Sequence, residues 1–367
     1  MNARAAVAVV TVALLGHAVV LAVWPAAHTL LIDLQVYRAG GQHVVDGIPL
    51  YAGGVLLDLP FVYPPFAALV FAPLAWLPFP VLATAWTLLG VGLLAVVVHR
   101  CGASGPLLVA LVALATWLDP VRTTLYLGQV NIVLLALVAA DLFGRPHRLR
   151  GVGIGLAAAV KLTPLLFVAY LLVTRRIRAA ATALGVFVVA GAVGFLVAPA
   201  DSVQFWLRGT FASAGRISDV AGPSNTALAG LLARAGLPEV VPSALLALAV
   251  LAVAAALHRR GDDLAAGTLV GLGSAAAAPF AWSHHWVWVV PLVVLLARRA
   301  VAGERAAAAG LGGVLLVTLA FVTRLPGPAV GPIPATGAVS LAPDAYLALF
   351  LVVLGVAARS LRRPAHV

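Results

Sequence analysis

Apolar runs long enough to cross a lipid bilayer recur along the chain, and they constrain its fold more than any other feature. The first covers roughly Ala5–Trp24, and similar runs follow as far as the C-terminal region. Hydrophobic residues make up 63% of the chain and charged residues 10%, whereas a soluble domain carries about 25% charged residues. Because long uninterrupted apolar runs are typical of membrane helices and not of barrel strands, we predict an all-α polytopic membrane protein.

Short basic clusters separate the apolar runs and predict the topology. They lie at His99–Arg100, Arg145–Arg150, Arg175–Arg178, His258–Arg260, Arg298–Arg305 and Arg359–Arg363. Placed between spans in this way, the net charge of +11 is a topology signal and not a nucleic-acid footprint, so we expect no nucleic-acid partner. The positive-inside rule then places these clusters and both termini on the cytoplasmic side of the membrane.

Hydropathy predicts ten full crossings in a single membrane-embedded domain of residues 1–367. After the first span, the crossings are expected near Val81–Val98, Pro106–Leu118, Val130–Phe143, Ala179–Val197, Val240–Leu257, Leu264–Ala278, Trp286–Ala297, Ala306–Val322 and Ala345–Ala358. An even number agrees with two cytoplasmic termini.

Two further apolar segments do not fit a simple crossing. Phe66–Leu77 is too short for a hydrocarbon core of about 30 Å at 1.5 Å per residue. Gly151–Val173 has arginines on both sides, which indicates a helical hairpin broken at Pro164, with Lys161 near the tip. Together with the crossings, these segments give about 10 to 13 transmembrane or re-entrant helices.

A polar loop, residues 25–65, follows the first span and is predicted to face outward. It carries Asp33, Asp46 and Asp58. Asp33 has two interpretations of similar weight: a general base for an acceptor hydroxyl, or the N-cap of an amphipathic helix over Leu34–Val45. Asp46 precedes a glycine and fits a turn better, and the sequence indicates no partner for Asp58.

Lys161 is the only lysine in the chain and lies within an apolar segment. A charge at membrane depth costs a few kcal/mol and marks a functional site by default, although a lysine can also snorkel to the interface. If Lys161 is functional, a phosphate is the natural partner of its compact charge. The single Cys101 matches no metal-ligand spacing, so no metal ligands are assigned; no cofactor is expected, and metal dependence is left open by the sequence.

Other polar groups lie at the predicted outer ends of spans. An aromatic belt explains Trp282 and Trp286, but it does not explain His284 and His285, which could bind sugar hydroxyls or a phosphate. Adjacent histidines point in different directions from a helix and make a poor metal site. The amides of Gln129, Asn131 and Asn225 can bind sugar hydroxyls or cap helices.

The order of these short motifs resembles glycosyltransferase family 87. The motifs that carry the resemblance are Asp33-Leu34-x-Val36-Tyr37, Gly47-x-Pro49-Leu50-Tyr51, Val62-Tyr63-Pro64-Pro65-Phe66, Gly128-Gln129-Val130-Asn131, Lys161-Leu162-Thr163-Pro164 and Trp282-Ser283-His284-His285. Members of this family are GT-C-type membrane enzymes, and the best-known ones are actinobacterial mannosyltransferases that use polyprenyl-phosphate mannose.

The resemblance implies an inverting transfer of a sugar, most simply mannose, from a polyprenyl-phosphate donor to a hydroxyl of a cell-envelope glycolipid or lipoglycan at the outer membrane face. The family's catalytic aspartate carries over to Asp33. Donor phosphate and sugar contacts are implied for Lys161, His284, His285 and Tyr63, and acceptor or sugar contacts for Tyr37, Gln129, Asn131 and Asn225. The sequence departs from the family's Asn-Gln-Ser-like pattern at Ser224–Ala227.

Two alternatives remain open from the sequence. An arabinofuranosyltransferase that uses polyprenyl-phosphate arabinose would share the fold and the outward site. A secondary transporter, a different class of protein, is favoured by the broken hairpin and the lysine at membrane depth. Inverted repeats would support the transporter, and none is visible in the sequence.

Overall fold

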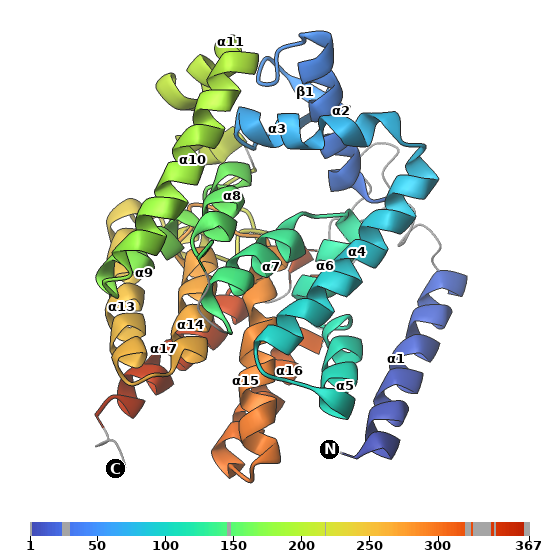
Figure 1. The fold of residues 1–367 in the computed structure, drawn as a ribbon, viewed down its shortest axis with the longest axis vertical. Coiled ribbons are helices and arrows are strands. Elements are labelled where there is room, and N and C mark those ends of the chain that lie inside the picture. The colour runs from blue at the N-terminus through green and yellow to red at the C-terminus, as the bar shows by residue number, and fades with distance from the viewer. Residues whose placement is uncertain are drawn as a thin grey trace. The chain divides into compact units, whose positions relative to one another are not determined.

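Helices form most of the part of the chain that the structure describes, as the apolar runs predict. The computed structural model describes residues 2–23, 30–144, 148–216, 218–319, 324–325, 339–340 and 343–362. In these ranges the only strands are two short antiparallel pairs, β1 (Gly54–Leu56) with β2 (Leu59–Pro60), and β3 (Arg324–Leu325) with β4 (Val339–Ser340). The prediction of an all-α polytopic fold is confirmed (Figure 1).

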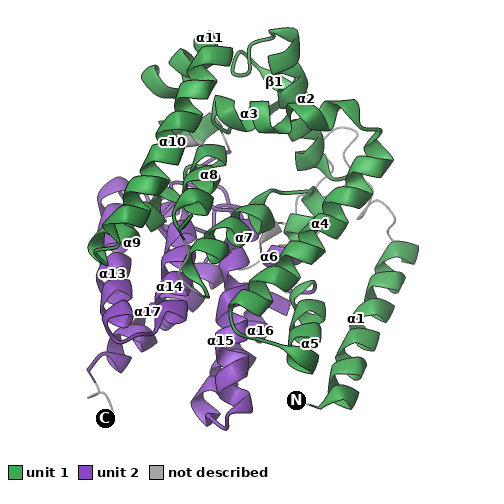
Figure 2. Ribbon diagram, in the orientation of Figure 1, with its two compact units in different colours: residues 1–116, 122–217 green, residues 117–121, 218–367 purple. Residues whose placement is uncertain are grey.

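The chain divides into two compact units, shown in different colours in Figure 2. Residues 1–116 and 122–217 form unit 1, and residues 117–121 and 218–367 form unit 2. These are groups of contacts within one chain, and the single membrane-embedded domain of residues 1–367 stays a prediction.

Unit 1 contains the N-terminal helices, and one of them, α6, has its first turn in unit 2. They are α1 (Ala3–Val23), α2 (Ile32–Asp46), α3 (Pro65–Phe71), η2 (Ala72–Trp76), α4 (Phe79–Arg100), α5 (Gly105–Ala115), α6 (Asp119–Leu127), α7 (Asn131–Leu142), α8 (Val152–Val160), α9 (Leu165–Val173), α10 (Ile177–Val197), α11 (Pro199–Ser202), η3 (Val203–Leu207), η4 (Thr210–Ala212) and η5 (Ala214–Arg216).

Unit 2 contains the remaining helices. They are α12 (Leu228–Arg234), α13 (Val240–Arg259), α14 (Asp263–Ala276), η6 (Ser283–Trp288), α15 (Val289–Val301), α16 (Arg305–Leu319) and α17 (Ala345–Ser360). Within this unit, Gly271 lets α14 approach the Trp288 ring, because a Cβ at Gly271 would lie 1.9 Å from that ring.

Fewer helices are long enough to cross a membrane than the sequence predicts. In the described ranges four qualify by length and composition, α1, α4, α10 and α13, and α5 with α6 makes a fifth if the pair, bent by 66°, counts as one span. Four further apolar stretches have 10–17 residues: residues 65–76, α7, α16 and α17. Each of the ten predicted crossings contains a helix in the structure, but most of these helices are shorter than 18 residues, so the number of full crossings stays a prediction.

Some predicted segments fall partly outside the described residues. These are Trp24 at the end of the first span, residues 25–29 of the outward loop, residues 145–147 of a basic cluster, residues 320–322 of a predicted crossing, and residue 363 of the last basic cluster.

The two segments that did not fit a simple crossing are each broken. Residues 66–77 form the short helix α3 followed by the 3-10 helix η2. In 151–173, α8 ends before Lys161 and α9 begins after Pro164. Proline lacks the N–H that a helix needs and disfavours helical geometry in the residue before it, which explains the second break.

Helix α2 is amphipathic and is held by close backbone packing. Its buried residues Leu34, Tyr37 and Gly41 share one face. A Cβ added to Gly41 would lie 2.7 Å from the Cα of Ala72, so only glycine allows α2 to lie this close to η2. The same argument holds for Gly40, where a Cβ would lie 2.5 Å from the Phe61 ring. This packing fixes the helix that carries Asp33.

The loop after α2 is fastened to a distant part of unit 1. The Leu50 N–H donates to Asp201 Oδ1 at 2.9 Å, across 151 positions of sequence. Arg216 Nη1 donates to the Tyr51 carbonyl at 3.1 Å, across 165 positions. The Tyr51 hydroxyl in turn donates to the Tyr63 carbonyl at 2.6 Å, so the loop is tied at both ends.

Candidate functional site

Asp33 lies inside the first turn of α2 and does not cap it. The helix begins at Ile32, and its N-cap, Leu31, has a left-handed backbone (φ 34°) and no side-chain cap. Asp33 Oδ2 instead accepts a hydrogen bond from Gln129 Nε2 at 2.8 Å. The N-cap interpretation of Asp33 is wrong, because the helix starts two residues earlier than the pattern predicts.

Gln129 is the centre of a buried hydrogen-bond network. Its Oε1 accepts from the Tyr37 hydroxyl at 2.7 Å and from the Tyr63 hydroxyl at 3.4 Å, while its Nε2 donates to Asp33. The two tyrosine hydroxyls lie 3.0 Å apart, and the rings pack edge to face at 5.2 Å. The Val130 N–H donates to the Tyr37 oxygen at 3.3 Å. Three segments far apart in sequence therefore meet at one carboxylate.

Gly128 permits the close approach of this corner to the start of α2. Its backbone has φ +70°, which favours glycine, and a Cβ there would lie 2.7 Å from the Leu34 Cβ and 3.0 Å from the Leu31 Cβ. A side chain at this position would push the α6–α7 corner, and Gln129 with it, away from Asp33.

Lys161 lies at the break between α8 and α9 and joins the same site. Its Nζ donates to Asn131 Oδ1 at 3.1 Å and lies 5.9 Å from the centroid of the Tyr63 ring, within the range of a cation–π contact. Its charge also acts on Asp33. We call Asp33, Tyr37, Tyr63, Gln129, Asn131 and Lys161 the carboxylate cluster.

The electrostatics of the cluster favour a base that works near neutral pH. Burial raises the pKa of Asp33 from 3.8 to about 6, and the Gln129 hydrogen bond and the Lys161 charge oppose part of that rise. Burial and the nearby Asp33 charge hold the pKa of Tyr63 far above its usual value. Tyr63 therefore stays protonated and donates hydrogen bonds, while Asp33 titrates in a range suited to general base catalysis.

The other two aspartates of the loop have the local roles expected of them. Asp46 ends α2, accepts from Gln42 Nε2 at 2.8 Å, and is followed by Gly47 with φ 68°. Asp58 is exposed in the turn between β1 and β2.

The predicted histidine site lies in unit 2. Trp282 and His284 stack at 5.5 Å between ring centroids, and the rings of His284 and His285 meet edge on at 4.8 Å. His284 is buried at 4% exposure, and His285 is half-buried. Among the residues described, no group of three or more His, Cys, Asp or Glu side chains is placed to hold a metal ion.

Asn225 makes its hydrogen bonds to the backbone of unit 2. Its Nδ2 donates to the carbonyls of Val220 and Pro279, at 2.9 Å and 3.2 Å. Its Oδ1 accepts from the N–H groups of Ala227 and Ala281, at 3.2 Å and 3.1 Å. A primary amide has two N–H donors and two lone pairs, so these contacts fill its capacity. The geometry supports a structural role in place of the predicted sugar contact.

Thr226 extends this arrangement. Its N–H and its hydroxyl both donate to the Ala281 carbonyl, at 2.8 Å and 2.7 Å. Trp286 Nε1 donates to the threonine oxygen at 2.8 Å. We call Asn225, Thr226 and Trp286 the asparagine cluster.

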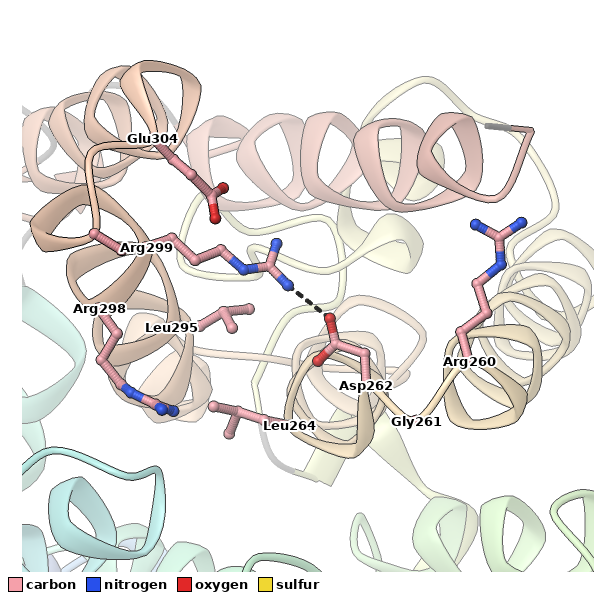
Figure 3. A pocket seen from close by; sticks show the side chains of 9 residues that line it. Arg260, Gly261, Asp262, Leu264, Leu295, Arg298, Arg299 and Glu304 are labelled. Atoms are coloured by element: carbon pink, nitrogen blue, oxygen red, sulfur yellow. Dashed lines mark hydrogen bonds and ion pairs between the residues drawn. The ribbon is translucent and has the colours of Figure 1, made fainter. Parts of the chain in front are cut away.

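A basic pocket of about 440 Å³ lies at the ends of α13, α14 and α15, in unit 2. Figure 3 shows the Arg299 guanidinium directed at Asp262, with an Nη2–Oδ2 distance of 2.7 Å. Arg260 Nη1 donates to the Ser360 carbonyl at 2.9 Å, at the end of α17. These two arginines therefore pair with an acid and with the end of a helix.

The sequence identified the members of the carboxylate cluster but not their connections. It assigned Tyr37 and Gln129 to sugar contacts, whereas in the structure they bond to each other and Gln129 donates to Asp33. The only signal was the order of the motifs, since Asp33 and Gln129 are separated by 96 positions.

Comparison with known proteins adds a family and several relatives. The glycosyltransferase family 87 profile matches residues 61–279. A polyprenol-phosphate-mannose-dependent alpha-(1-2)-phosphatidylinositol mannoside mannosyltransferase of Mycolicibacterium smegmatis is 39% identical over 80% of this chain and 76% of its own length. Its namesake in Mycobacterium tuberculosis is 38% identical over 80% and 77%.

A second kind of relative is named for a different acceptor, phosphatidylinositol pentamannoside. The polyprenol-phosphate-mannose-dependent alpha-(1-2)-phosphatidylinositol pentamannoside mannosyltransferase of Mycobacterium tuberculosis is 34% identical over 80% of this chain and 72% of its own length. No solved structure matches the chain significantly.

Proposed function

Because the chain belongs to glycosyltransferase family 87, we propose that it transfers mannose from polyprenyl-phosphate mannose to a hydroxyl of a phosphatidylinositol mannoside. The names of the relatives support mannose as the sugar, in preference to arabinose, and a glycolipid as the acceptor. The family and the donor named for its relatives also favour an enzyme over a secondary transporter.

The observation that carries the mechanism is the environment of Asp33. Its carboxylate is held at one oxygen by Gln129, lies in the field of Lys161, and titrates at a pKa of about 6. A carboxylate of this kind can take the proton of an acceptor hydroxyl as that hydroxyl attacks.

In the proposed step, Asp33 removes the proton of the acceptor hydroxyl while its oxygen bonds to the anomeric carbon. The bond between that carbon and the phosphate oxygen breaks, and polyprenyl phosphate leaves with the electron pair. A single displacement inverts the anomeric carbon and needs one base without a covalent enzyme intermediate. Lys161 would stabilise the charge that develops on the departing phosphate.

The remaining members of the carboxylate cluster support these two groups. Asn131 accepts from the Lys161 ammonium, and the Tyr63 ring lies against it, so both would orient Lys161 toward the donor phosphate. His284 and His285 are proposed to contact the donor sugar or phosphate, and the step requires no metal or cofactor.

We further propose that transfer takes place at the outer face of the plasma membrane. The basic clusters favour a cytoplasmic side that contains both termini, which puts the Asp33 loop outside. Nucleotide sugars are cytoplasmic, so an outward site needs a donor carried across the membrane, and a polyprenyl phosphate provides both an anchor and a leaving group.

The test is transfer of labelled mannose from polyprenyl-phosphate mannose to phosphatidylinositol mannosides by purified protein in detergent. Asp33→Asn keeps the shape of the side chain but is a far weaker base, and we expect a loss of about 10²- to 10⁴-fold in kcat. Asp58→Asn, in an exposed turn, is the matched control and should keep wild-type turnover. Wild-type turnover in Asp33→Asn would overturn the role of Asp33.

Two further arms separate the rival functions. Substituting polyprenyl-phosphate arabinose for the mannose donor should abolish transfer. Proteoliposomes that take up free sugar or lipid-linked sugar while forming no glycosylated lipid would identify a transporter instead.

A further inference from the structure

We propose that Gln129 is a positioning residue that holds one oxygen of Asp33 and leaves the other oxygen to take the acceptor's proton. This inference rests on the proposed function, since it requires Asp33 to be the base. It assigns Gln129 to the base and not to the sugar.

The tyrosines fix which end of the Gln129 amide faces Asp33. The Tyr37 oxygen accepts from the Val130 N–H at 3.3 Å, so its own proton must go to another acceptor. The nearest acceptor is Gln129 Oε1, at 2.7 Å. The Tyr63 hydroxyl, 3.0 Å from Tyr37 and 3.4 Å from the same amide oxygen, is a second donor on that side.

The reverse orientation of the amide is unfavourable. It would place Gln129 Oε1 opposite Asp33 Oδ2 at 2.8 Å, so that two acceptors would meet without a proton between them. It would also turn the NH₂ group toward the tyrosine hydroxyls and leave their protons without that acceptor. The network therefore favours an N–H directed at an ionised Asp33.

The two oxygens of the Asp33 carboxylate therefore have different roles. Oδ2 accepts from Gln129, while no hydrogen bond to Oδ1 is formed by the described part of the chain. Oδ1 is thus the oxygen available to an incoming hydroxyl. Gln129 is 5% exposed, its amide oxygen accepts from the two tyrosines, and one N–H of its amide is directed at Asp33.

The charged and titratable groups that act on Asp33 are few. They are the Lys161 ammonium and the phenols of Tyr37 and Tyr63. The elements α3, η2 and β1, which pack against α2, carry no titratable side chain. A change in the acid limb of the pH profile after substitution of Gln129 can therefore be traced to the lost hydrogen bond.

The experiment compares kcat/KM between pH 5 and pH 9 for the wild type, Gln129→Leu and Asp33→Asn, with labelled polyprenyl-phosphate mannose as the donor. Gln129→Leu keeps the approximate volume and loses the N–H that stabilises the carboxylate. The free energy of a hydrogen bond to a charged group corresponds to a pKa change of about 1 to 2 units. The acid limb should move from near pH 6 upward by that amount.

This shift has a signature that a structural role would not produce. The ratio of Gln129→Leu to wild-type kcat/KM should rise about 5- to 40-fold between pH 6 and pH 8.5 as the carboxylate ionises. Loss of packing alone would lower activity by the same factor at every pH. The matched control is Gln42→Leu, which removes a Gln–Asp hydrogen bond of the same 2.8 Å length elsewhere on α2 and should leave the profile unchanged.

The possible outcomes test separately the role of Asp33 as the base and the role of Gln129 as its positioning residue. If Asp33→Asn keeps wild-type turnover, the proposed base is wrong. If Asp33→Asn is inactive and the Gln129→Leu ratio is flat across pH, Asp33 is still the base and the positioning role of Gln129 is overturned. If Gln129→Leu fails to fold, Tyr37→Phe serves in its place, because it removes the hydroxyl that donates to Gln129 Oε1. The midpoint of the acid limb should then move upward by about 0.5 pH units. An unchanged midpoint in Tyr37→Phe also overturns the positioning role of Gln129.

Discussion

The carboxylate cluster and the asparagine cluster are both buried polar networks, but they bond differently. In the carboxylate cluster, side chains bond mainly to other side chains, through Asp33, Gln129 and Tyr37. In the asparagine cluster, Asn225 makes all four of its bonds to backbone groups. A side chain saturated by the backbone holds loops in place, whereas a side-chain network can orient a reactive group and still leave one of its atoms available.

This contrast predicts that substitutions in the asparagine cluster act on stability and those in the carboxylate cluster act on turnover. The largest effect on stability is expected for Asn225→Ala, which leaves buried backbone N–H and C=O groups without partners. We expect the free energy of unfolding to fall by about 3 kcal/mol, measured as the denaturation midpoint in detergent. Asp33→Asn is the paired variant and should unfold close to the wild type. A stable Asn225→Ala protein with a raised acceptor KM would show that Asn225 binds ligand.

The next effect tests the packing beneath the carboxylate cluster. Gly128→Ala places a Cβ 2.7 Å from the Leu34 Cβ in a left-handed backbone, which must shift Gln129 or Asp33. A misplacement of about 1 Å costs about 100-fold in rate, so kcat/KM should fall to that extent. Gly53→Ala is the control, because a Cβ there meets nothing within 4 Å. Equal activity of the two variants would mean that the corner is not rigid.

Lys161 tests the donor side of the carboxylate cluster. Lys161→Gln keeps a hydrogen-bond donor for Asn131 but removes the charge proposed to meet the phosphate. We expect kcat/KM for polyprenyl-phosphate mannose to fall about 30-fold, the value of a charge-assisted hydrogen bond. Arg208→Gln, at an exposed arginine that bonds Gln204, is the control and should have no effect. An unchanged KM and kcat in Lys161→Gln would exclude the phosphate role.

The smallest expected effect is on stability and tests one hydrogen bond of the asparagine cluster. Trp286→Phe keeps most of the ring that stacks on Tyr346 but loses the N–H that donates to Thr226 at 2.8 Å. The loss should destabilise the protein by about 1 kcal/mol and leave kcat unchanged. Trp76→Phe, at a side chain 74% exposed, should not change the midpoint. A fall in kcat without a fall in stability would show that Trp286 takes part in the reaction.

The fold could be predicted from the sequence where one physical signal dominates. Apolar runs of about twenty residues predict helices, and α1, α4, α10 and α13 fill the predicted spans nearly end to end. The break at Pro164 was predictable because proline cannot continue a helix. The helix α6, which follows α5 at a bend of 66°, was not predicted, because it lies beyond the predicted span Pro106–Leu118.

The site shows the same division between local and distant information. Asp33 was identified from its place after the first span, but its bond to Gln129 joins residues 96 positions apart. No local pattern specifies such a contact. Whether Asp33 caps α2 depends on the residue at which that helix begins. Helix ends are the boundaries that sequence patterns place least accurately.

The fastening of the loop after α2 to Asp201 and Arg216 has a consequence for biosynthesis. A ribosome makes the chain from its N-terminus, so Leu50 and Tyr51 emerge 151 and 165 positions before the residues they bond. This loop, which follows the helix that carries the proposed base, therefore lacks both bonds until α11 and η5 have been translated. A chain released before that point holds every residue from Asp33 to Lys161 and still lacks the two bonds that fasten the loop after α2.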